Sequence, residues 1–222
     1  PWRKPEDKLW PIMSSKQMLY LKMCSENEGK KVFESSTKFD WYVLKNAIDP
    51  KTATTIIDEH GHINNLILSK WPFLPNGSYD LIKKLFDFEQ TATFSPIFTS
   101  VYNSTKKDIL STTHKAGYSY PIVYTINKDG KTIWYSSLKD DTQFIPKIML
   151  SKGRYIYPTL DISGEYGMSE IVFGLPIKTK NEGERIIKAL NSSQFQAVLK
   201  DTKWGSFNTE WKMFNYLRKD FW

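Results

Sequence analysis

The feature that most restricts the fold of this chain is the turn sequence Asn127-Lys128-Asp129-Gly130, which separates two runs of β-forming residues. Glycine adopts positive φ without steric cost, so this turn between strand-forming residues predicts a tight β-hairpin. Strand-forming runs recur before and after it, which makes this part of the chain strand-rich. The expected strands cover 97–102, 122–126, 132–136, 147–150, 157–161 and 171–177.

The first ninety residues are predicted to hold strands and one helix. Apolar residues alternate with Tyr20 and Lys22, a pattern typical of a half-buried strand. We expect a turn at Asn27-Glu28-Gly29, and Ser78 is placed to cap a helix. The expected strands cover 18–24 and 39–44, the hairpin 54–58 and 63–68, and the helix 79–86.

Helices are expected near the end of the chain, over 182–190, 193–200 and 209–217. Ser192 is placed to cap the second of them. The stretch 89–96 is predicted to be a linker. The fold class is therefore α+β, with a domain boundary near residue 50 and another possible near residue 90.

Composition favours an anionic partner without deciding which. The chain of 222 residues has a formal net charge of +7, and aromatic residues make up 15% of it, so we expect some rings to face a ligand. Cys24 is the one cysteine and cannot form an internal disulfide, and no apolar run is long enough to span a membrane. These observations predict a cytoplasmic protein without a membrane partner. His60, His62 and His114 are too few and too isolated from cysteine for a structural zinc site.

The final twenty residues place aromatic rings among cations, a combination suited to a polyanion whose bases can stack. Trp211, Phe214 and Leu217 recur at helical spacing and are expected to pack on the rest of the fold. Trp204 and the cations of this segment then remain for binding.

Motifs of known catalytic chemistry are absent from the sequence: it has no glycine-rich phosphate loop, no nucleophile elbow and no His-Glu-x-x-His helix. Glu28-Gly29-Lys30 has the Glu-x-Lys form of metal-dependent nucleases, although such a tripeptide often arises by chance and a turn at Gly29 is the simpler explanation. Asp140-Asp141 is expected to be a solvated acidic pair in a loop. The loop 164–169 either carries contacts or only joins two strands.

Several blocks, in order along nearly the whole chain, resemble successive blocks of one protein family. They are Trp2-Arg3-Lys4-Pro5, Thr37-Lys38-Phe39-Asp40-Trp41-Tyr42-Val43-Leu44, Trp71-Pro72-Phe73-Leu74-Pro75-Asn76, Tyr118-Ser119-Tyr120-Pro121, Trp134-Tyr135-Ser136-Ser137, Glu165-Tyr166-Gly167-Met168-Ser169, Glu182-Gly183-Glu184-Arg185-Ile186 and the tail 203–222. The family is that of adenine-specific DNA methyltransferases of restriction-modification type, found in phages, large DNA viruses and bacteria.

In that family the amino half binds S-adenosylmethionine and carries an Asn/Asp-Pro-Pro-Tyr/Phe motif, neither of which this sequence contains. The resemblance therefore implies the C-terminal part of such an enzyme, inactive alone and binding no cofactor itself. Residues 1–50 would be the end of the catalytic domain and 51–222 a DNA target-recognition domain. The implied fold is the tail of a methyltransferase-type sheet followed by a mixed, strand-rich domain with C-terminal helices. The implied partners are double-stranded DNA and the missing N-terminal catalytic domain, and a sequence that begins with Pro1 agrees with a piece of a longer protein.

The resemblance also implies site residues. An enzyme that methylates a ring amine must extrude the base and read the neighbouring sequence separately. In related enzymes an aromatic residue before the last strand hairpin of the catalytic domain stacks on the extruded adenine. Phe33 matches that position best and Phe39 second, although either could be a core residue.

For DNA contacts we expect exposed polar residues around the central hairpin and its following loop. Arg and Gln can pair bidentately with guanine and adenine edges, while Lys and Ser mostly hold phosphates. The candidates are Lys128, Lys131, Ser136, Ser137, Lys139, Gln143, Lys147, Lys152 and Arg154, with Lys203, Trp204, Arg218 and Lys219 as backbone contacts.

Two other classes of function remain open from the sequence. A metal-dependent nuclease would bind divalent ions and cleave through Glu28 and Lys30. A free-standing nucleic-acid-binding protein without catalysis would prefer single strands, whereas a target-recognition domain prefers duplex DNA and has a salt-dependent affinity.

Overall fold

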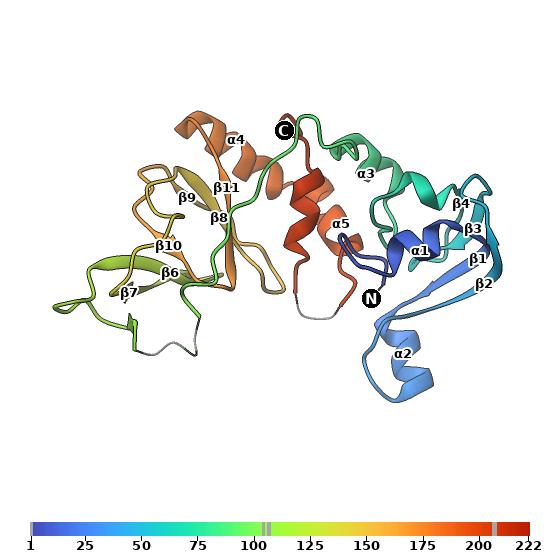
Figure 1. Ribbon diagram of the computed structural model, residues 1–222, viewed down its shortest axis with the longest axis horizontal. Coiled ribbons are helices and arrows are strands. Elements are labelled where there is room, and N and C mark those ends of the chain that lie inside the picture. The colour runs from blue at the N-terminus through green and yellow to red at the C-terminus, as the bar shows by residue number, and fades with distance from the viewer. Residues whose placement is uncertain (1, 104, 106–107, 206–207) are drawn as a thin grey trace. The chain divides into compact units, whose positions relative to one another are not determined.

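The computed structural model describes residues 2–103, 105, 108–205 and 208–222, and it has a mixed α+β fold. The chain forms two compact units (Figure 1). The first unit contains the residues up to 89 together with 197–213, and the second contains 90–196 together with 214–222. Within the described residues, no helix has both the length and the apolar character that crossing a membrane requires.

The first unit is built on a four-stranded sheet of order β2-β1-β3-β4, in which β1 pairs antiparallel with β2 and parallel with β3. Its elements are α1 (Trp10–Ser14), β1 (Lys16–Cys24), α2 (Glu26–Phe33), β2 (Phe39–Ile48), β3 (Thr54–Ile57), β4 (Ile63–Leu66), the 3₁₀ helix η1 (Leu68–Lys70) and α3 (Tyr79–Leu85). Residue 50 lies between β2 and β3, two strands of this one sheet. The two compact units divide after residue 89.

Helix α2 replaces the turn predicted at Asn27-Glu28-Gly29. Ser25 caps the helix, because its hydroxyl accepts the Glu28 N–H and the Glu28 carboxylate accepts the Ser25 N–H. A Cβ on Gly29 would overlap the carbonyl oxygen of Thr37, so glycine serves a close approach of helix and loop here rather than a turn. The expectation of a turn was therefore wrong.

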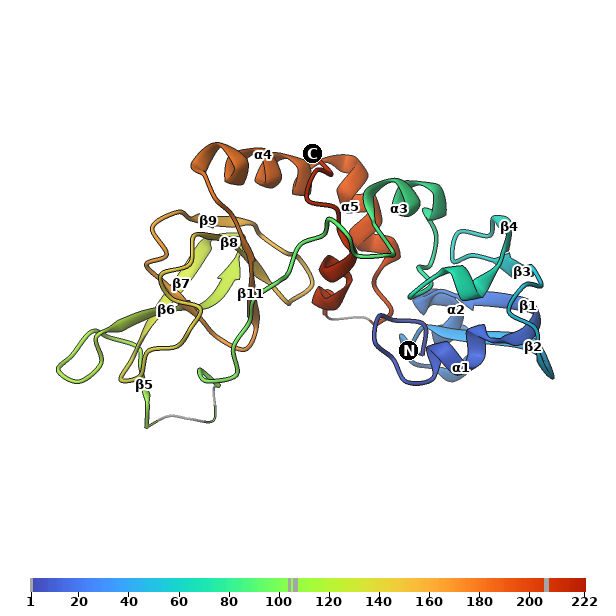
Figure 2. The same cartoon turned by 45° about the horizontal axis from the view of Figure 1, so that its top comes forward.

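The second unit contains two sheets, of order β10-β6-β7-β5 and β11-β8-β9. Its elements are β5 (Leu110–Ser111), β6 (Tyr120–Asn127), β7 (Gly130–Ser136), β8 (Lys147–Ser151), β9 (Thr159–Asp161), β10 (Gly167–Met168), β11 (Val172–Pro176) and α4 (Lys180–Leu190). Helix α4 packs against β8 and β9 (Figure 2). Helix α5 (Ser193–Asp201) and the 3₁₀ helix η2 (Trp211–Tyr216) follow along the chain.

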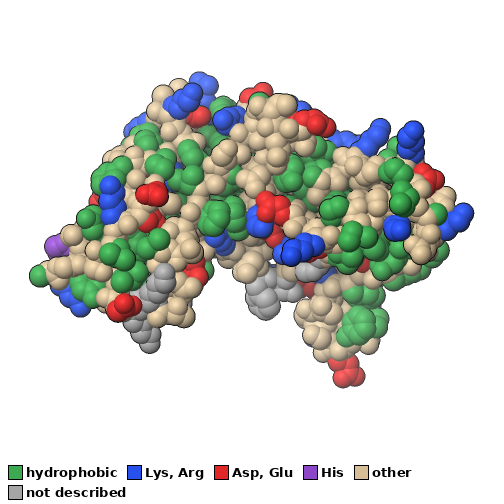
Figure 3. All heavy atoms as spheres, in the orientation of Figure 1, with side chains coloured by type: hydrophobic (Ala, Val, Ile, Leu, Met, Phe, Trp, Pro, Cys, Tyr) green, Lys and Arg blue, Asp and Glu red, His purple; other side chains and the backbone are tan. Residues whose placement is uncertain are grey.

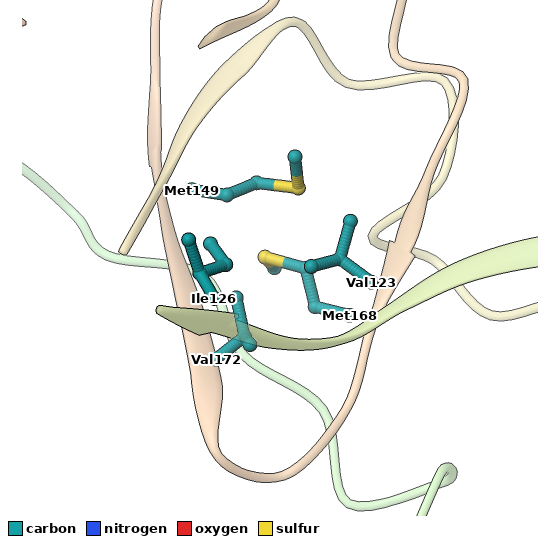
Figure 4. Packing of buried hydrophobic residues seen from close by; sticks show 5 residues of the cluster. All are labelled: Val123, Ile126, Met149, Met168 and Val172. Atoms are coloured by element: carbon teal, nitrogen blue, oxygen red, sulfur yellow. The ribbon is translucent and has the colours of Figure 1, made fainter. Parts of the chain in front are cut away.

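The core of the second unit joins its two sheets. Val123 and Ile126 of β6 pack with Met149 of β8, Met168 of β10 and Val172 of β11, and all five side chains are buried (Figure 4). Buried aliphatic and thioether side chains of this kind supply most of the stability of a small unit.

The predicted hairpin is confirmed, since β6 and β7 pair antiparallel with Asn127 opposite Gly130. Three local expectations were wrong. Among the elements that the structure describes, no strand covers residues 97–102. Ile97 makes only an isolated bridge to Gly174. Ser78 does not cap α3, because its backbone is left-handed and its hydroxyl donates to the Asp201 carboxylate at 2.5 Å. The last predicted helix is the shorter 3₁₀ helix η2.

Candidate nucleic-acid interface

The β6–β7 hairpin presents two of the predicted DNA-binding lysines. Gly130 has a φ of +116°, so the chain reverses sharply, and Lys128 and Lys131 are both exposed at the tip. The Lys131 ammonium group lies 3.6 Å from the centroid of the Tyr166 ring, which comes from the loop before β10. A cation over a ring face is held by the ring quadrupole while its charge stays accessible.

The same arrangement recurs elsewhere in the second unit. Lysine ammonium groups lie over rings in three further pairs: Lys139 with Phe144 at 4.4 Å, Lys152 with Phe98 at 5.3 Å and Lys115 with Tyr118 at 4.5 Å. The rings of Phe98 and Phe144 are more than half exposed, at 52% and 64%. The second unit therefore carries cations and exposed rings together.

Three of the residues expected to be exposed around the hairpin are buried, so that expectation was wrong for them. Ser136 has an exposed fraction of 0% and Lys147 also 0%, and Gln143 is buried with its amide group donating to the Pro121 carbonyl. The predicted solvated pair is also wrong in part, since Asp140 is buried and accepts the Thr142 N–H. None of these side chains has a surface from which to reach a nucleic acid.

Lys147 is part of a buried ion pair. Its ammonium group donates to the Asp161 carboxylate at 2.8 Å, and that carboxylate also accepts the backbone N–H groups of Glu165 and Tyr166. Burial lowers the pKa of Lys147 below its ordinary value of 10.5, and the effect of Asp161 in the opposite direction is smaller. The pair orders the loop between β9 and β10.

The remaining candidates of this group lie nearer the surface. Lys139 and Arg154 are exposed, and Ser137 and Lys152 are half-buried. The Lys152 ammonium group donates to the Glu170 carbonyl at 2.8 Å. The hairpin and its neighbouring loops thus keep Lys128, Lys131 and Lys139 exposed to an anionic ligand.

The two candidates for base stacking contact each other in the first unit. Phe33 ends α2 and Phe39 begins β2, and their ring centroids are 5.0 Å apart at an interplanar angle of 84°. Phe33 is 54% exposed and Val32 is 62% exposed, so α2 leaves apolar side chains at the surface of the first unit (Figure 3). Neither phenylalanine is a fully buried core residue.

Phe39 also lines a cavity of about 400 Å³ within the first unit. Two tryptophans and charged side chains share this cavity: its lining includes Trp2, Arg3, Lys38, Asp40 and Trp204. Its volume lies within the range of about 300–1,000 Å³ that is usual for small-ligand sites. The cavity combines flat rings with groups that can form hydrogen bonds.

The charged groups around this cavity are held by their own contacts. Arg3 donates to both oxygens of Asp40 at 2.8 Å, and both side chains are largely buried. Lys38 pairs with Glu59 at 2.6 Å and donates to the Lys203 carbonyl at 3.0 Å. Bidentate and charge-assisted contacts of this kind fix the wall of the cavity.

The C-terminal candidates are divided between the two units. Trp204 is 5% exposed and its indole N–H donates to the Leu74 carbonyl at 2.8 Å, so the expectation of an exposed backbone contact was wrong. Lys203 is half-buried. In the second unit Arg218 is half-buried and Lys219 is exposed, with the Lys219 N–H donating to the Ala92 carbonyl. Only Lys219 of these four is exposed.

Three apolar residues of the tail were expected to pack on the rest of the fold. Phe214 and Leu217 are buried as predicted, whereas Trp211 is half-buried.

Glu28, the carboxylate that a metal-dependent nuclease would require, makes contacts with residues of its own unit. Glu28 caps α2 and pairs with Lys22 at 3.1 Å. The hydrogen bond from the Ser25 N–H lowers the pKa of Glu28 below 4.5. Among the described residues no group of three or more His, Cys, Asp and Glu side chains is placed to hold a metal ion.

No family model matches the chain, and no curated protein matches it.

The sequence did not predict which aromatic rings the lysine ammonium groups contact. Tyr166 is 35 positions after Lys131 (166 − 131), so no local pattern joins them. Lys139 and Phe144 are close in sequence, and a phenylalanine at the end of the polar stretch after the lysine was the signal that could have indicated them. Trp2 and Asp40 lie in blocks of the family resemblance and were not expected to share a cavity with Phe39.

Proposed function

We propose that this chain is the C-terminal, DNA sequence-recognising part of a site-specific adenine DNA methyltransferase of restriction-modification type. The observation that carries the proposal is that two exposed lysines of the second unit, Lys131 and Lys139, lie over aromatic rings. Phosphates require accessible cations, and lysines held over rings lose less freedom when they bind. The order of family-like blocks along the sequence supports the same function.

In this proposal residues 1–50 belong to the end of the catalytic domain, and 51–222 recognise duplex DNA. Phe39 and Phe33 stack on an extruded adenine, because their rings are in contact and partly exposed, and Phe39 borders the cavity shared with Trp2. The catalytic domain that binds S-adenosylmethionine is a separate N-terminal part of the enzyme. The chain alone has no methyltransferase activity and binds no cofactor.

The DNA-binding part of the proposal is tested with a pool of duplexes that have a randomised centre. We expect selection on the purified chain to enrich one sequence, and the log of the affinity to fall linearly with the log of the salt concentration. Changing both Lys128 and Lys131 to Gln should reduce that slope by about 2. Lys188→Gln, which removes an exposed lysine from α4, is the matched control and should leave the slope unchanged. Equal affinity for single strands and duplexes would refute duplex recognition.

The methyltransferase part is tested separately on the gene. We expect the reading frame upstream of Pro1 to encode an Asn/Asp-Pro-Pro-Tyr/Phe motif, preceded by a glycine-containing cofactor loop. A start codon immediately before Pro1 would refute the methyltransferase assignment and leave a free-standing nucleic-acid-binding protein.

A further inference from the structure

A second cavity in the first unit, of about 380 Å³, lies between β4, η1 and α3. The residues with polar or aromatic groups in its lining are Asn65, Lys70, Trp71, Lys83 and Phe88. None of them was a site candidate, and the cavity does not include Phe39 or Trp204. Its volume suits a ligand of the size of a nucleotide.

The cavity has two cations and, among its described lining residues, no carboxylate. Lys70 ends η1 and Lys83 lies in the last turn of α3, and both are exposed. Neither ammonium group makes an ion pair or a hydrogen bond to another residue in the part of the chain that the structure describes. Lys83 is instead placed 5.3 Å from the centroid of the Trp71 ring. Two cations that no acid neutralises favour an anionic group between them.

Part of the cavity lining is aromatic. Trp71 is buried, and its ring centroid lies 5.1 Å from that of Phe88. Phe88 also contacts Phe73, with centroids 6.1 Å apart, and it is only half-buried. Two neighbouring rings therefore hold the Phe88 ring, which is left partly accessible to a flat ligand.

Asn65 adds a hydrogen-bond donor to the cavity. Its side-chain oxygen accepts the Thr55 hydroxyl at 3.1 Å, which leaves the amide NH₂ group to donate to a ligand. Ring nitrogens and carbonyl oxygens of a nucleobase are acceptors for such a donor.

We propose that this cavity binds a nucleotide, with the base against Phe88 and the phosphate between Lys70 and Lys83. The inference does not rest on the proposed function, because all of these residues lie in the first unit and none is a duplex-contacting candidate. The shared chemistry is a base that carries a phosphate. Its source is either a free nucleotide or a nucleotide within a single strand.

Calorimetric titration of the purified chain with AMP, adenosine and inorganic phosphate tests the combination. We expect AMP to bind at least ~10-fold more tightly than either adenosine or phosphate, because only AMP engages both the ring and the cations. The proposal is overturned if AMP does not bind at millimolar concentration, or if phosphate binds as tightly as AMP.

Variants separate this site from general attraction to a basic surface. Lys70→Gln and Lys83→Gln should each weaken AMP binding about fivefold or more. Lys84→Gln removes the neighbouring exposed lysine of α3, which does not line the cavity, and should leave binding unchanged. Phe88→Leu should weaken AMP binding and leave phosphate binding unchanged. An equal loss in Lys84→Gln would overturn the proposal.

Competition identifies the source of the nucleotide. If a single-stranded oligodeoxyadenylate of six nucleotides displaces AMP, the site binds single-stranded nucleic acid. If it fails to displace AMP, the site binds free nucleotides. The double variant Lys128→Gln, Lys131→Gln should bind AMP normally, so loss of duplex recognition and loss of this site give different results.

Discussion

Strands β8 and β2 contrast sharply in what they bury. All five residues of β8 are buried, including Lys147, whereas β2 exposes Trp41, Tyr42 and Val43. β8 lies between β11 and β9, while β2 is one of the two edge strands of its sheet. In these two strands the burial of a side chain therefore follows the position of the strand in its sheet more closely than the polarity of the side chain. A buried lysine and an exposed tryptophan are both compatible with stable strands when a partner or an edge is present.

Of the substitutions that test this comparison, Lys147→Met is expected to have the largest effect on stability. The substitution leaves the Asp161 carboxylate buried without its cation, and should lower the free energy of unfolding of the second unit by about 3–5 kcal/mol. Urea unfolding measures the loss. Lys128→Met, at the exposed hairpin tip, is the control and should change the stability by less than about 0.5 kcal/mol. A change below about 1 kcal/mol in Lys147→Met would mean that the ion pair does not hold β8 and β9 together.

A smaller effect is expected from Trp41→Thr on the edge strand. Trp41 is 47% exposed and its ring lies 5.0 Å from that of Tyr20 on β1. Threonine retains the strand preference, so the loss should be about 1 kcal/mol, from half a buried ring and one cross-strand aromatic pair. The same urea measurement on the first unit checks it. A loss as large as that of Lys147→Met would contradict the importance of the edge position.

The smallest effect is expected from Glu28→Ala in α2, which follows β1. The capping box should contribute about 0.5–1 kcal/mol to the local stability of α2. Because the pKa of Glu28 is lowered from 4.5, its contribution is present above pH 4.5 and is lost as the pH falls through the lowered pKa of the folded state. Hydrogen exchange of α2 amides should therefore differ between the two proteins at pH 7. The difference should shrink in acid, and a difference that persists unchanged at pH 2 would contradict the assigned role of the carboxylate.

Elements determined by local chemistry could be predicted from the sequence. The β6–β7 hairpin follows from Asn127 and Gly130, and α5 begins as expected where the Ser192 hydroxyl accepts the Phe195 N–H. The antiparallel pair of β3 and β4 was likewise predicted by its β-forming runs. In each case the deciding residues are within a few positions of one another.

Features that depend on distant partners could not be predicted. The burial of Lys147 requires Asp161, 14 positions later (161 − 147), and Ser78 is drawn away from α3 by Asp201. The cavity beside Phe39 contains Trp2 and Trp204, which come from opposite ends of the sequence. Gly29 of α2 suggested a turn, because the sequence around it does not reveal that the Thr37 carbonyl approaches it closely. Of the predicted DNA contacts, Lys128, Lys131, Lys139, Arg154 and Lys219 are exposed, and nothing in the sequence separated them from a buried candidate such as Lys147.

The Asp161 carboxylate connects the interior of the second unit to its charged surface. It accepts the Tyr166 N–H at 3.2 Å, and the Tyr166 ring holds the Lys131 ammonium group at the hairpin. A change at Asp161 should therefore release a cation that it does not touch. A genetic screen for loss of DNA binding would then recover substitutions of Asp161 as well as of exposed lysines. A map of the binding surface drawn from those substitutions would wrongly include this buried residue.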